Sequence, residues 1–258
     1  MKCVILAGGF GTRLSEETSL RPKPLVEIGG KPIIWHIMKI YAHHGINEFI
    51  ICCGYKGYMI KEYFANYLRQ NSDITIDLKS GDITYLNSPT EDWKVTLIDT
   101  GSDSMTGGRL LRLKPLLEKE EAFCFTYGDG LGNIDITASI GFHKTHGKLA
   151  TITGATPPGR FGAIRTLGKK AVNFREKQDT DNAIVNAGFF VLSPGIFDFL
   201  DNDSSIWENE PLEKLSQVEQ LYVFKHFEFW QPMDTLRDRN ALEEMWRENK
   251  AQWRVWKD

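Results

Sequence analysis

The sequence contains no run of eighteen or more apolar residues and no stripe of basic side chains. A helix needs about that many apolar residues to cross a bilayer. The 31 Lys and Arg residues are outnumbered by 34 Asp and Glu residues, for a net charge of −3. We therefore expect no membrane partner and no nucleic-acid partner, since nucleic acids bind clustered positive charge. No secretory signal pattern precedes the first apolar segment, so we expect a soluble, cytoplasmic protein.

Cysteine is also scarce, and its spacing does not indicate a metal site. The four cysteines show no C-x-x-C pattern, the spacing that zinc and redox sites use. Most of them lie inside apolar segments, where cysteine typically behaves as a small, reduced, apolar side chain. We therefore expect neither a metal nor a disulfide at Cys3, Cys52, Cys53 or Cys124.

No internal repeat, low-complexity stretch or proline-rich linker divides the chain. With 258 residues, of which 41% are hydrophobic, it is long enough for one substantial core. We predict a single domain over residues 1–258, in which residues 237–258 form an amphipathic helix and tail. The tryptophans of this tail are expected to pack on the body or on another subunit.

Apolar segments alternate with amphipathic ones along most of the chain. The expected strands span residues 4–7, 48–53, 94–99, 122–127 and 149–155, and the expected helices span residues 32–44, 58–68, 109–117 and 134–146. Such alternation is typical of an α/β fold with a mostly parallel (Rossmann-like) twisted sheet and helices on both faces. Residues 74–86 and 161–177 depart from it, because their central turn residues predict small antiparallel β-hairpins.

A glycine-rich loop follows the first expected strand. Gly8, Gly9 and Gly11 let the backbone turn without a Cβ and bring successive N–H groups close to a polyanion. Arg13 and Lys23 add positive charge. A loop of this kind is often only a turn with solvated basic residues, but the combination favours a triphosphate site. It is not a Walker A loop, because no Lys-Ser or Lys-Thr follows, nor a G-x-G-x-x-G fingerprint, because residue 14 is not glycine.

The segment from Gly8 to Lys23 resembles the signature of the sugar-1-phosphate nucleotidylyltransferases, which is G-x-G-T-R-L, a short spacer and P-K-P. The spacer and residues 25–32 look closest to the branch of this family that makes CDP-glucose. The resemblance implies that CTP and glucose 1-phosphate are converted to CDP-glucose and pyrophosphate, and we expect a homo-oligomer. The nucleotide contacts expected from the loop and from a later strand end are Leu6, Ala7, Gly8, Gly9, Gly11, Thr12, Arg13, Lys23 and Gly128.

Two aspartates are candidates for a metal site. Asp129 lies between glycines at the end of an apolar segment, and Asp234 precedes a helical pattern. On local grounds, an aspartate before a helix is more often an N-cap. In the family that the sequence resembles, however, two aspartates in matching motifs jointly hold Mg²⁺. Magnesium suits such a site, because it takes few protein carboxylates and completes its octahedron with phosphate oxygens and water.

The resemblance also assigns a sugar-phosphate site. Residues 174–177 resemble the motif E-K-P, although Gln178 replaces the proline and a surface Glu-Lys pair is the alternative. Residues 186–190 match a second motif, in which an amide and a glycine N–H meet sugar hydroxyls. The residue at position 207 is equally suited to be a core anchor. The expected sugar-phosphate contacts are Tyr127, Glu176, Lys177, Asn186, Gly188 and Trp207.

Residues 105–110 look like the base-recognition segment of the CDP-glucose branch. The resemblance places Thr106, Gly107 and Arg109 near the base, and Arg109 is a sensible donor to O2 or N3 of cytosine. The alternative is that Thr106 is an N-cap and the glycines a loose helix start. Two other functions stay open, namely the same reaction with dTTP or UTP, and a nucleotide-sugar-binding protein that has lost turnover.

The implied chemistry is an in-line attack of a sugar-phosphate oxygen on the α-phosphorus of CTP. The attacking phosphate is already ionised at neutral pH, so the protein supplies positioning and charge neutralisation rather than a nucleophile. Arg13 would stabilise the departing pyrophosphate, Lys23 the transferred phosphoryl group and Lys177 the incoming phosphate. Asp129 would act through the metal ion that it shares with Asp234.

Overall fold

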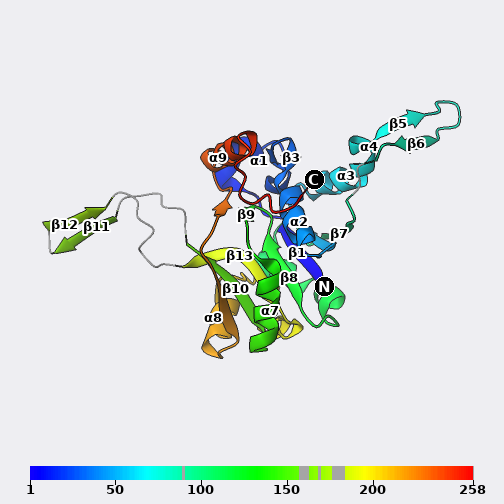
Figure 1. Cartoon of the computed structure of the whole chain (residues 1–258). Coiled ribbons are helices and arrows are strands. Elements are labelled where there is room, and N and C mark those ends of the chain that lie inside the picture. The colour runs from blue at the N-terminus through cyan, green and yellow to red at the C-terminus, as the bar shows by residue number, and fades with distance from the viewer. Residues whose placement is uncertain (89–90, 157–162, 168–169, 176–183, 258) are drawn as a thin grey trace.

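The computed structural model describes residues 1–88, 91–156, 163–167, 170–175 and 184–257 (Figure 1). A seven-stranded sheet with the order β14-β10-β13-β8-β1-β4-β7 forms its centre. β13 runs antiparallel to β8 and β10, and the other described pairs in this sheet are parallel, which confirms the predicted mostly parallel sheet. The strands are β1 (Lys2–Ala7), β4 (Glu48–Cys53), β7 (Lys94–Asp99), β8 (Phe123–Tyr127), β10 (Ala150–Ala155), β13 (Val185–Leu192) and β14 (Leu221–His226).

Both faces of this sheet are covered, because its central strands are apolar on both sides. Along β1, Cys3, Ile5 and Ala7 belong to one buried cluster, whereas Val4 and Leu6 belong to another. This alternation is the expected period of two along a strand. Beside the first cluster lie α2 (Ile33–His43), α3 (Gly57–Ala65), α4 (Tyr67–Asn71), α7 (Ile136–His146) and α9 (Leu236–Arg247), and beside the second lie α5 (Thr106–Leu111), α6 (Lys114–Leu117), the 3-10 helix η3 (Pro194–Phe199) and α8 (Glu210–Gln217).

Several element boundaries differ from the sequence-based prediction. The expected helix 109–117 is divided into α5 and α6, with Pro115 in the first turn of α6. Proline has no N–H to continue a helix from the preceding turn. The expected helix 58–68 is likewise two helices, α3 and α4, which meet at Asn66. Strand β14 was not predicted, although its first four residues are apolar, and most of its side chains are partly or fully exposed.

Both predicted hairpins are antiparallel pairs. β5 (Asp73–Ile76) pairs with β6 (Ile83–Leu86), and β11 (Ala163–Leu167) pairs with β12 (Lys170–Arg175). The β5–β6 hairpin extends away from the body of the molecule (Figure 1). Two shorter antiparallel pairs are β2 (Glu27–Ile28) with β3 (Lys31–Pro32), and β9 (Gly130–Gly132) with β15 (Trp230–Pro232).

The C-terminal helix and tail pack on the body of the same chain. Trp246 on α9 and Trp253 in the tail lie against the ring of His36 on α2, with ring centroids 4.9 and 6.1 Å away. Trp246 also covers Gly29, whose φ is +58°, and a Cβ at this glycine would lie 2.0 Å from the indole nitrogen. The first of the two packing arrangements predicted for the tail is therefore confirmed.

All four cysteine side chains are free and buried, as expected for small apolar side chains in apolar segments. Burial raises the pKa of the Cys53 thiol to about 11, so this side chain stays protonated at neutral pH. Within the described part of the chain, no helix is long and apolar enough to cross a membrane.

His36 predicts a loss of folding stability in mild acid. Its Nε2 faces the Ile28 carbonyl at 2.8 Å and its Nδ1 accepts a hydrogen bond from Trp253 at 3.4 Å, so the neutral ring is satisfied on both sides. Burial lowers its pKa from 6.5 to about 4 despite the nearby Glu243. The unfolded chain therefore takes up a proton first as the pH falls from 6.5 towards 4, and the fold loses up to about 3 kcal/mol.

Urea unfolding at a series of pH values measures this effect. The His36→Gln variant keeps a donor and an acceptor but does not titrate, so its stability should change less between pH 6.5 and 4 than that of the parent. The buried His143, whose pKa is also lowered to about 4, contributes equally to both proteins. Identical pH profiles for parent and variant would refute the assignment to His36.

Candidate active site

A cavity of about 810 Å³ opens at the carboxyl ends of β1 and β8. Ligands of parallel α/β sheets bind outside these strand ends. The cavity is lined by residues 6–13, 23–24, 102–106, 126–130 and 186–189, by Arg109 and Glu208, and by Trp230, Pro232 and Asp234. All the expected nucleotide contacts line it except Gly107, which packs against the backbone of Ser205, where a Cβ would lie 2.8 Å from the carbonyl oxygen.

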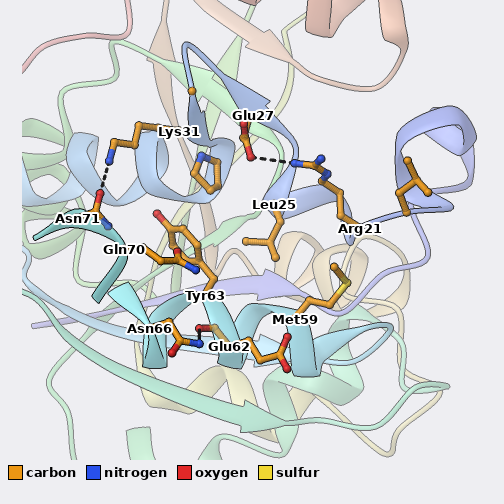
Figure 2. Close-up of a pocket in the computed structure, with 13 residues that line it drawn as sticks. Arg21, Leu25, Glu27, Lys31, Met59, Glu62, Tyr63, Asn66, Gln70 and Asn71 are labelled. Atoms are coloured by element: carbon orange, nitrogen blue, oxygen red, sulfur yellow. Dashed lines mark hydrogen bonds and ion pairs between the residues drawn. The ribbon is translucent and has the colours of Figure 1, made fainter. Parts of the chain in front are cut away.

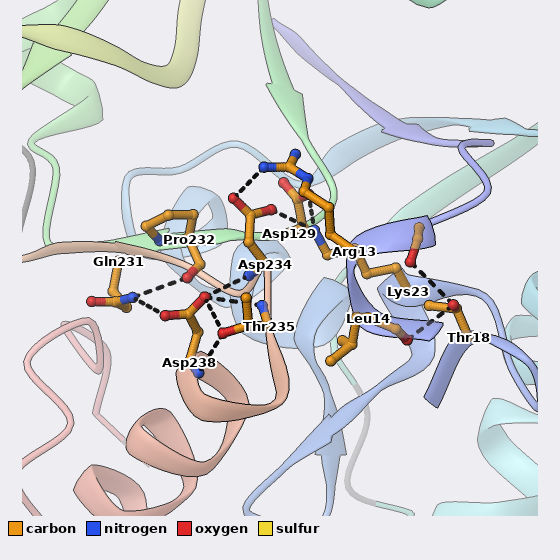
Figure 3. A network of polar contacts seen from close by, with 11 residues as sticks. Arg13, Leu14, Thr18, Lys23, Asp129, Gln231, Pro232, Asp234, Thr235 and Asp238 are labelled. Atoms are coloured by element: carbon orange, nitrogen blue, oxygen red, sulfur yellow. Dashed lines mark hydrogen bonds and ion pairs between the residues drawn. The ribbon is translucent and has the colours of Figure 1, made fainter. Parts of the chain in front are cut away.

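Lys23 stands between the two candidate metal ligands (Figure 3). Its ammonium lies 2.6 Å from Asp129 Oδ2 and 2.9 Å from Asp234 Oδ1, and Arg13 donates to Asp234 Oδ2 at 2.7 Å. Burial alone would lower the pKa of Lys23, but the charges and hydrogen bonds of both carboxylates outweigh burial and raise this pKa. Two cations and two carboxylates predicted from distant parts of the sequence thus meet at one point.

Backbone pairing brings Asp234 to Asp129. β9, which begins directly after Asp129, pairs with β15, and the Met233 N–H donates to the Asp129 carbonyl at 2.8 Å. The alternative that Asp234 caps the following helix is wrong, because Thr235 is the N-cap of α9 and forms a capping box with Asp238. The Asp234 side chain is therefore available to the cavity.

The glycine-rich loop is held in a bent form by its own neighbours. Gly11 has a φ of +65°, and a Cβ there would lie 2.7 Å from the Thr18 side chain. The Thr18 hydroxyl donates to the carbonyls of Gly11 and Leu14 at 3.1 and 3.0 Å, across the short helices η1 (Thr12–Leu14) and α1 (Ser15–Thr18). The Lys56 ammonium donates to the Thr18 carbonyl at 3.3 Å and also to that of the next residue. The loop therefore has a defined shape before any ligand binds.

Arg109 is 4% exposed, and both terminal nitrogens of its guanidinium are hydrogen-bonded to the protein. Its two terminal nitrogens donate five hydrogen bonds, at 2.7 to 3.3 Å, to oxygens of Gly8, Cys53, Thr100, Gly101 and Ser102. The prediction that this guanidinium reads cytosine does not fit this arrangement, because none of its terminal N–H groups is left for a base. Through these hydrogen bonds, Arg109 instead links the glycine-rich loop to the ends of β4 and β7.

The other residues of segment 105–110 were interpreted either as base contacts or as an N-cap followed by a loose helix start. Neither interpretation fits all of them. Thr106 lines the cavity, and its hydroxyl donates to Glu208 Oε2 at 2.6 Å and accepts from the Trp207 N–H at 2.9 Å. It is the first residue of α5 rather than its N-cap, which is Met105. Gly108 is a close-contact glycine, since a Cβ there would lie 2.2 Å from the Asp203 carbonyl oxygen.

Three of the expected sugar contacts line the far part of the cavity, namely Tyr127, Asn186 and Gly188. Asn186 Oδ1 accepts from the Gly188 N–H at 2.8 Å, and the Tyr127 hydroxyl is buried without a hydrogen-bond partner among the described residues. Trp207 is 0% exposed and packs against Phe125 and Phe190, so the core-anchor alternative is correct. Glu176 and Lys177 lie outside the described residues.

Glu208, Trp230 and Phe10 are among the side chains of this cavity that sequence reasoning missed. Glu208 was overlooked beside its more conspicuous neighbour Trp207, although a carboxylate is the better hydrogen-bond acceptor for a hydroxyl. Trp230 was overlooked because its role is long-range: its Nε1 donates to the Ala187 carbonyl at 2.9 Å. Phe10, at the middle of the glycine-rich loop, is 51% exposed and lies 5.2 Å from the Tyr55 ring.

The sequence model of the nucleotidyl transferase family matches residues 2–231. The chain belongs to this family. A glucose-1-phosphate cytidylyltransferase of Salmonella typhimurium is 57% identical over 256 residues, which cover 99% of this chain and 100% of that protein. A Bacillus subtilis protein named as a probable glucose-1-phosphate cytidylyltransferase is 46% identical over 257 residues, which cover 99% of this chain and 100% of that protein.

Two solved structures with low sequence identity share the fold of this nucleotidyl transferase. HddC from Yersinia pseudotuberculosis, complexed with GMP-PN, superposes with a TM-score of 0.69 at 22% identity and covers 95% of this chain and 99% of that chain. A UDP-glucose pyrophosphorylase complexed with UDP-glucose gives a TM-score of 0.66 at 15% identity, with 96% and 98% covered. At these identities the likeness establishes the fold alone.

The donor set of this nucleotidyl transferase fits the predicted magnesium ion. Asp129 and Asp234 already converge on one cation, the ammonium of Lys23, so their oxygens point to a common position. No group of three or more His, Cys, Asp or Glu side chains that could hold a metal is found among the described residues. An ion with only two protein ligands completes its shell from substrate phosphates and water, which is the way in which Mg²⁺ is usually bound.

We expect Arg109 to be a stability determinant of this nucleotidyl transferase. The Arg109→Met variant removes five hydrogen bonds and leaves buried oxygens unpaired, so it should lower the free energy of unfolding by at least about 3 kcal/mol. Urea unfolding measures the loss. The matched control is Arg112→Met, because Arg112 pairs with Asp203 on the surface and should change stability by no more than about 0.5 kcal/mol. Parental stability in Arg109→Met, together with a changed ratio of CTP to UTP use, would restore the base-reading role.

Proposed function

We propose that this chain transfers the cytidylyl group of CTP to α-D-glucose 1-phosphate, releasing pyrophosphate and CDP-glucose. The observation that carries the proposal is the 57% identity with a glucose-1-phosphate cytidylyltransferase along the whole chain. The geometry supports the reaction class, since a glycine-rich loop, two cationic side chains and two carboxylates line one cavity at the sheet edge.

The triphosphate lies against the backbone N–H groups of residues 8–12, whose loop is already shaped by Thr18, Lys56 and Arg109. Arg13, whose side chain is 72% exposed, exchanges Asp234 for the departing pyrophosphate. Lys23 exchanges the two carboxylates for the α-phosphoryl group as negative charge develops there. A Mg²⁺ ion held by Asp129 and Asp234 would neutralise phosphate charge.

The sugar end of the cavity contains hydroxyl-binding groups of complementary type. The Glu208 carboxylate accepts hydrogen bonds, and the Asn186 amide can both donate and accept them. The Tyr127 hydroxyl lacks a hydrogen-bond partner among the described side chains. We assign the glucose ring to these groups and the phosphate of the incoming sugar to Lys177. The attacking oxygen needs no base, because it is ionised at neutral pH, and the products leave without a covalent enzyme intermediate.

We also propose that the protein works as a homo-oligomer in the cytoplasm. The β5–β6 hairpin, which extends from the body, exposes Ile76, Leu78, Tyr85 and Leu86, and exposed apolar side chains in such a cluster favour contact with another protein surface. Light scattering during size-exclusion chromatography measures the mass, and a particle of one chain's 29.4 kDa would contradict this assignment.

Pyrophosphate release with glucose 1-phosphate and each of CTP, UTP, dTTP and ATP tests the proposed reaction. We expect release with CTP to exceed that with each other nucleotide by at least about ten-fold in the specificity constant. Asp129→Asn serves as the inactive control. A preference for UTP or dTTP would replace the base assignment, and release with none of the four nucleotides would indicate a nucleotide-sugar-binding protein.

A further inference from the structure

A second cavity, of about 700 Å³, is lined by residues on both sides of the turn that carries Lys23, and Figure 2 shows its lining side chains. This volume is within the range of small-molecule sites. One wall is formed by α3 and α4 with residue 66 between them, and the other by residues 20–32, including β2 and β3. The two cavities share no lining residue, so the second one is not an extension of the catalytic cavity.

The charges around this second cavity balance. Arg21 pairs with Glu27 at 2.9 Å, and the Lys31 ammonium donates to Asn71 Oδ1 at 2.6 Å, while Glu62 lines the opposite wall. Two cations thus face two carboxylates, which offers no surplus charge to a phosphate or a cation. A phosphate would have to break the Arg21–Glu27 ion pair or the Lys31–Asn71 hydrogen bond, whereas an uncharged ligand would not.

The remaining polar groups both donate and accept hydrogen bonds. Asn66, Gln70 and Asn71 contribute amides, and the Tyr63 hydroxyl is buried without a hydrogen-bond partner among the described residues. Tyr63 also offers a ring. Amides, carboxylates and an aromatic ring around a volume of this size match a sugar ring, whose hydroxyls act in both directions and whose C–H face is apolar.

The turn between the two cavities provides a physical connection to the reaction. It is the 3-10 helix η2 (Lys23–Leu25), closed by hydrogen bonds from Leu25 N to Pro22 O at 2.8 Å and from Val26 N to Lys23 O at 3.0 Å. Lys23 faces the catalytic cavity and Leu25 faces the second one. A ligand that packs on Leu25 therefore acts on the segment that positions the Lys23 ammonium.

We propose that the second cavity binds a neutral, hydroxyl-rich ligand of hexopyranose type and that its occupancy is coupled to nucleotide binding through the Lys23–Leu25 turn. The coupling rests on the proposed function, but the binding does not. The sugar arrives either free or as the hexosyl part of a sugar nucleotide, and these two sources share the ring hydroxyls that the cavity recognises.

Calorimetric titration of the full chain with methyl α-D-glucopyranoside tests the binding without turnover. We expect Gln70→Leu and Tyr63→Phe to weaken binding by at least about five-fold, the effect of one lost hydrogen bond. Tyr63→Phe should melt no earlier than the parent, because it removes an unpartnered buried hydroxyl. Tyr41→Phe is the matched control, since it removes another such hydroxyl outside this cavity and should bind the glucoside normally.

Three further outcomes would overturn the proposal. The first is no glucoside binding to the parent, and the second is binding that Asn186→Ala abolishes while Gln70→Leu leaves it intact, which would place the sugar in the catalytic cavity. The third is competition by inorganic phosphate, which would show an anion site.

CDP-glucose, added after CTP and Mg²⁺ have filled the catalytic cavity, should displace the glucoside only if the sugar nucleotide is the source. An affinity for the glucoside that CTP and Mg²⁺ change by less than about two-fold would refute the coupling but not the site.

Discussion

Replacing Asp129 or Asp234 by asparagine is expected to lower the turnover number at least about a hundred-fold while leaving the fold intact. Each substitution keeps the shape of the side chain and removes one of the two charges that converge on the Lys23 ammonium. If both carboxylates hold one Mg²⁺, the loss of either disables the same unit. The double variant should therefore be little worse than each single variant, which steady-state rates at saturating CTP measure.

Asp135→Asn provides the matched control for these variants. Asp135 is the N-cap of α7, its side chain accepts from the Ala138 N–H at 2.8 Å, and it lies outside the cavity. Because asparagine caps a helix about as well as aspartate, this variant should keep parental activity. Losses that add in the double variant would instead mean that Asp129 and Asp234 act separately and share no ion.

The Lys23→Ala variant should lower the turnover number by at least about a hundred-fold and change the Michaelis constant for CTP far less. The reason is that an ammonium at the α-phosphorus stabilises charge that develops only in the transition state. Lys23→Arg should rescue little, because a planar fork cannot replace a compact ammonium in a side-chain position that is 9% exposed. Unchanged turnover in Lys23→Ala would remove this residue from the mechanism.

A second measurement on the same variant follows from the ion pairs. Lys23 occupies both carboxylates in the structure, so its removal frees them for a divalent cation. In the absence of nucleotide, Mn²⁺ should therefore bind Lys23→Ala at least about ten-fold more tightly than the parent, as electron paramagnetic resonance can measure. Lys39→Ala is the control, since Lys39 pairs with Glu91 away from the cavity and should leave Mn²⁺ binding unchanged.

The parts of the site that could be predicted from sequence are those with a local signal. The loop from Gly8 to Lys23 has its glycines and cations within a short segment, and strands with apolar side chains on both faces identify the parallel sheet. The meeting of Asp129 with Asp234 needed the family motifs, because the β9–β15 pairing that joins them spans about a hundred residues and leaves no periodic pattern.

The predictions that differ from the structure concern side chains with two plausible environments. Arg109 is a surplus cation near a nucleotide loop, and nothing in the sequence tells that five oxygens from other segments surround it. Gly8 is accounted for by the same contact, since a Cβ there would lie 2.2 Å from the Arg109 guanidinium. Trp207 is likewise a core residue. Its residue type could not predict this, since large aromatic side chains serve binding and packing equally well.

The Lys23 ammonium also affects how the stability of the folded protein depends on magnesium. Two carboxylates directed at one point repel each other, and many metal sites fold only when an ion relieves that repulsion. Here the chain carries its own counter-ion, so we expect the resting protein to hold its shape without magnesium. A chelator should therefore halt the reaction without lowering the melting temperature, and fluctuations in the magnesium supply of a cell would change the rate of synthesis rather than the amount of enzyme.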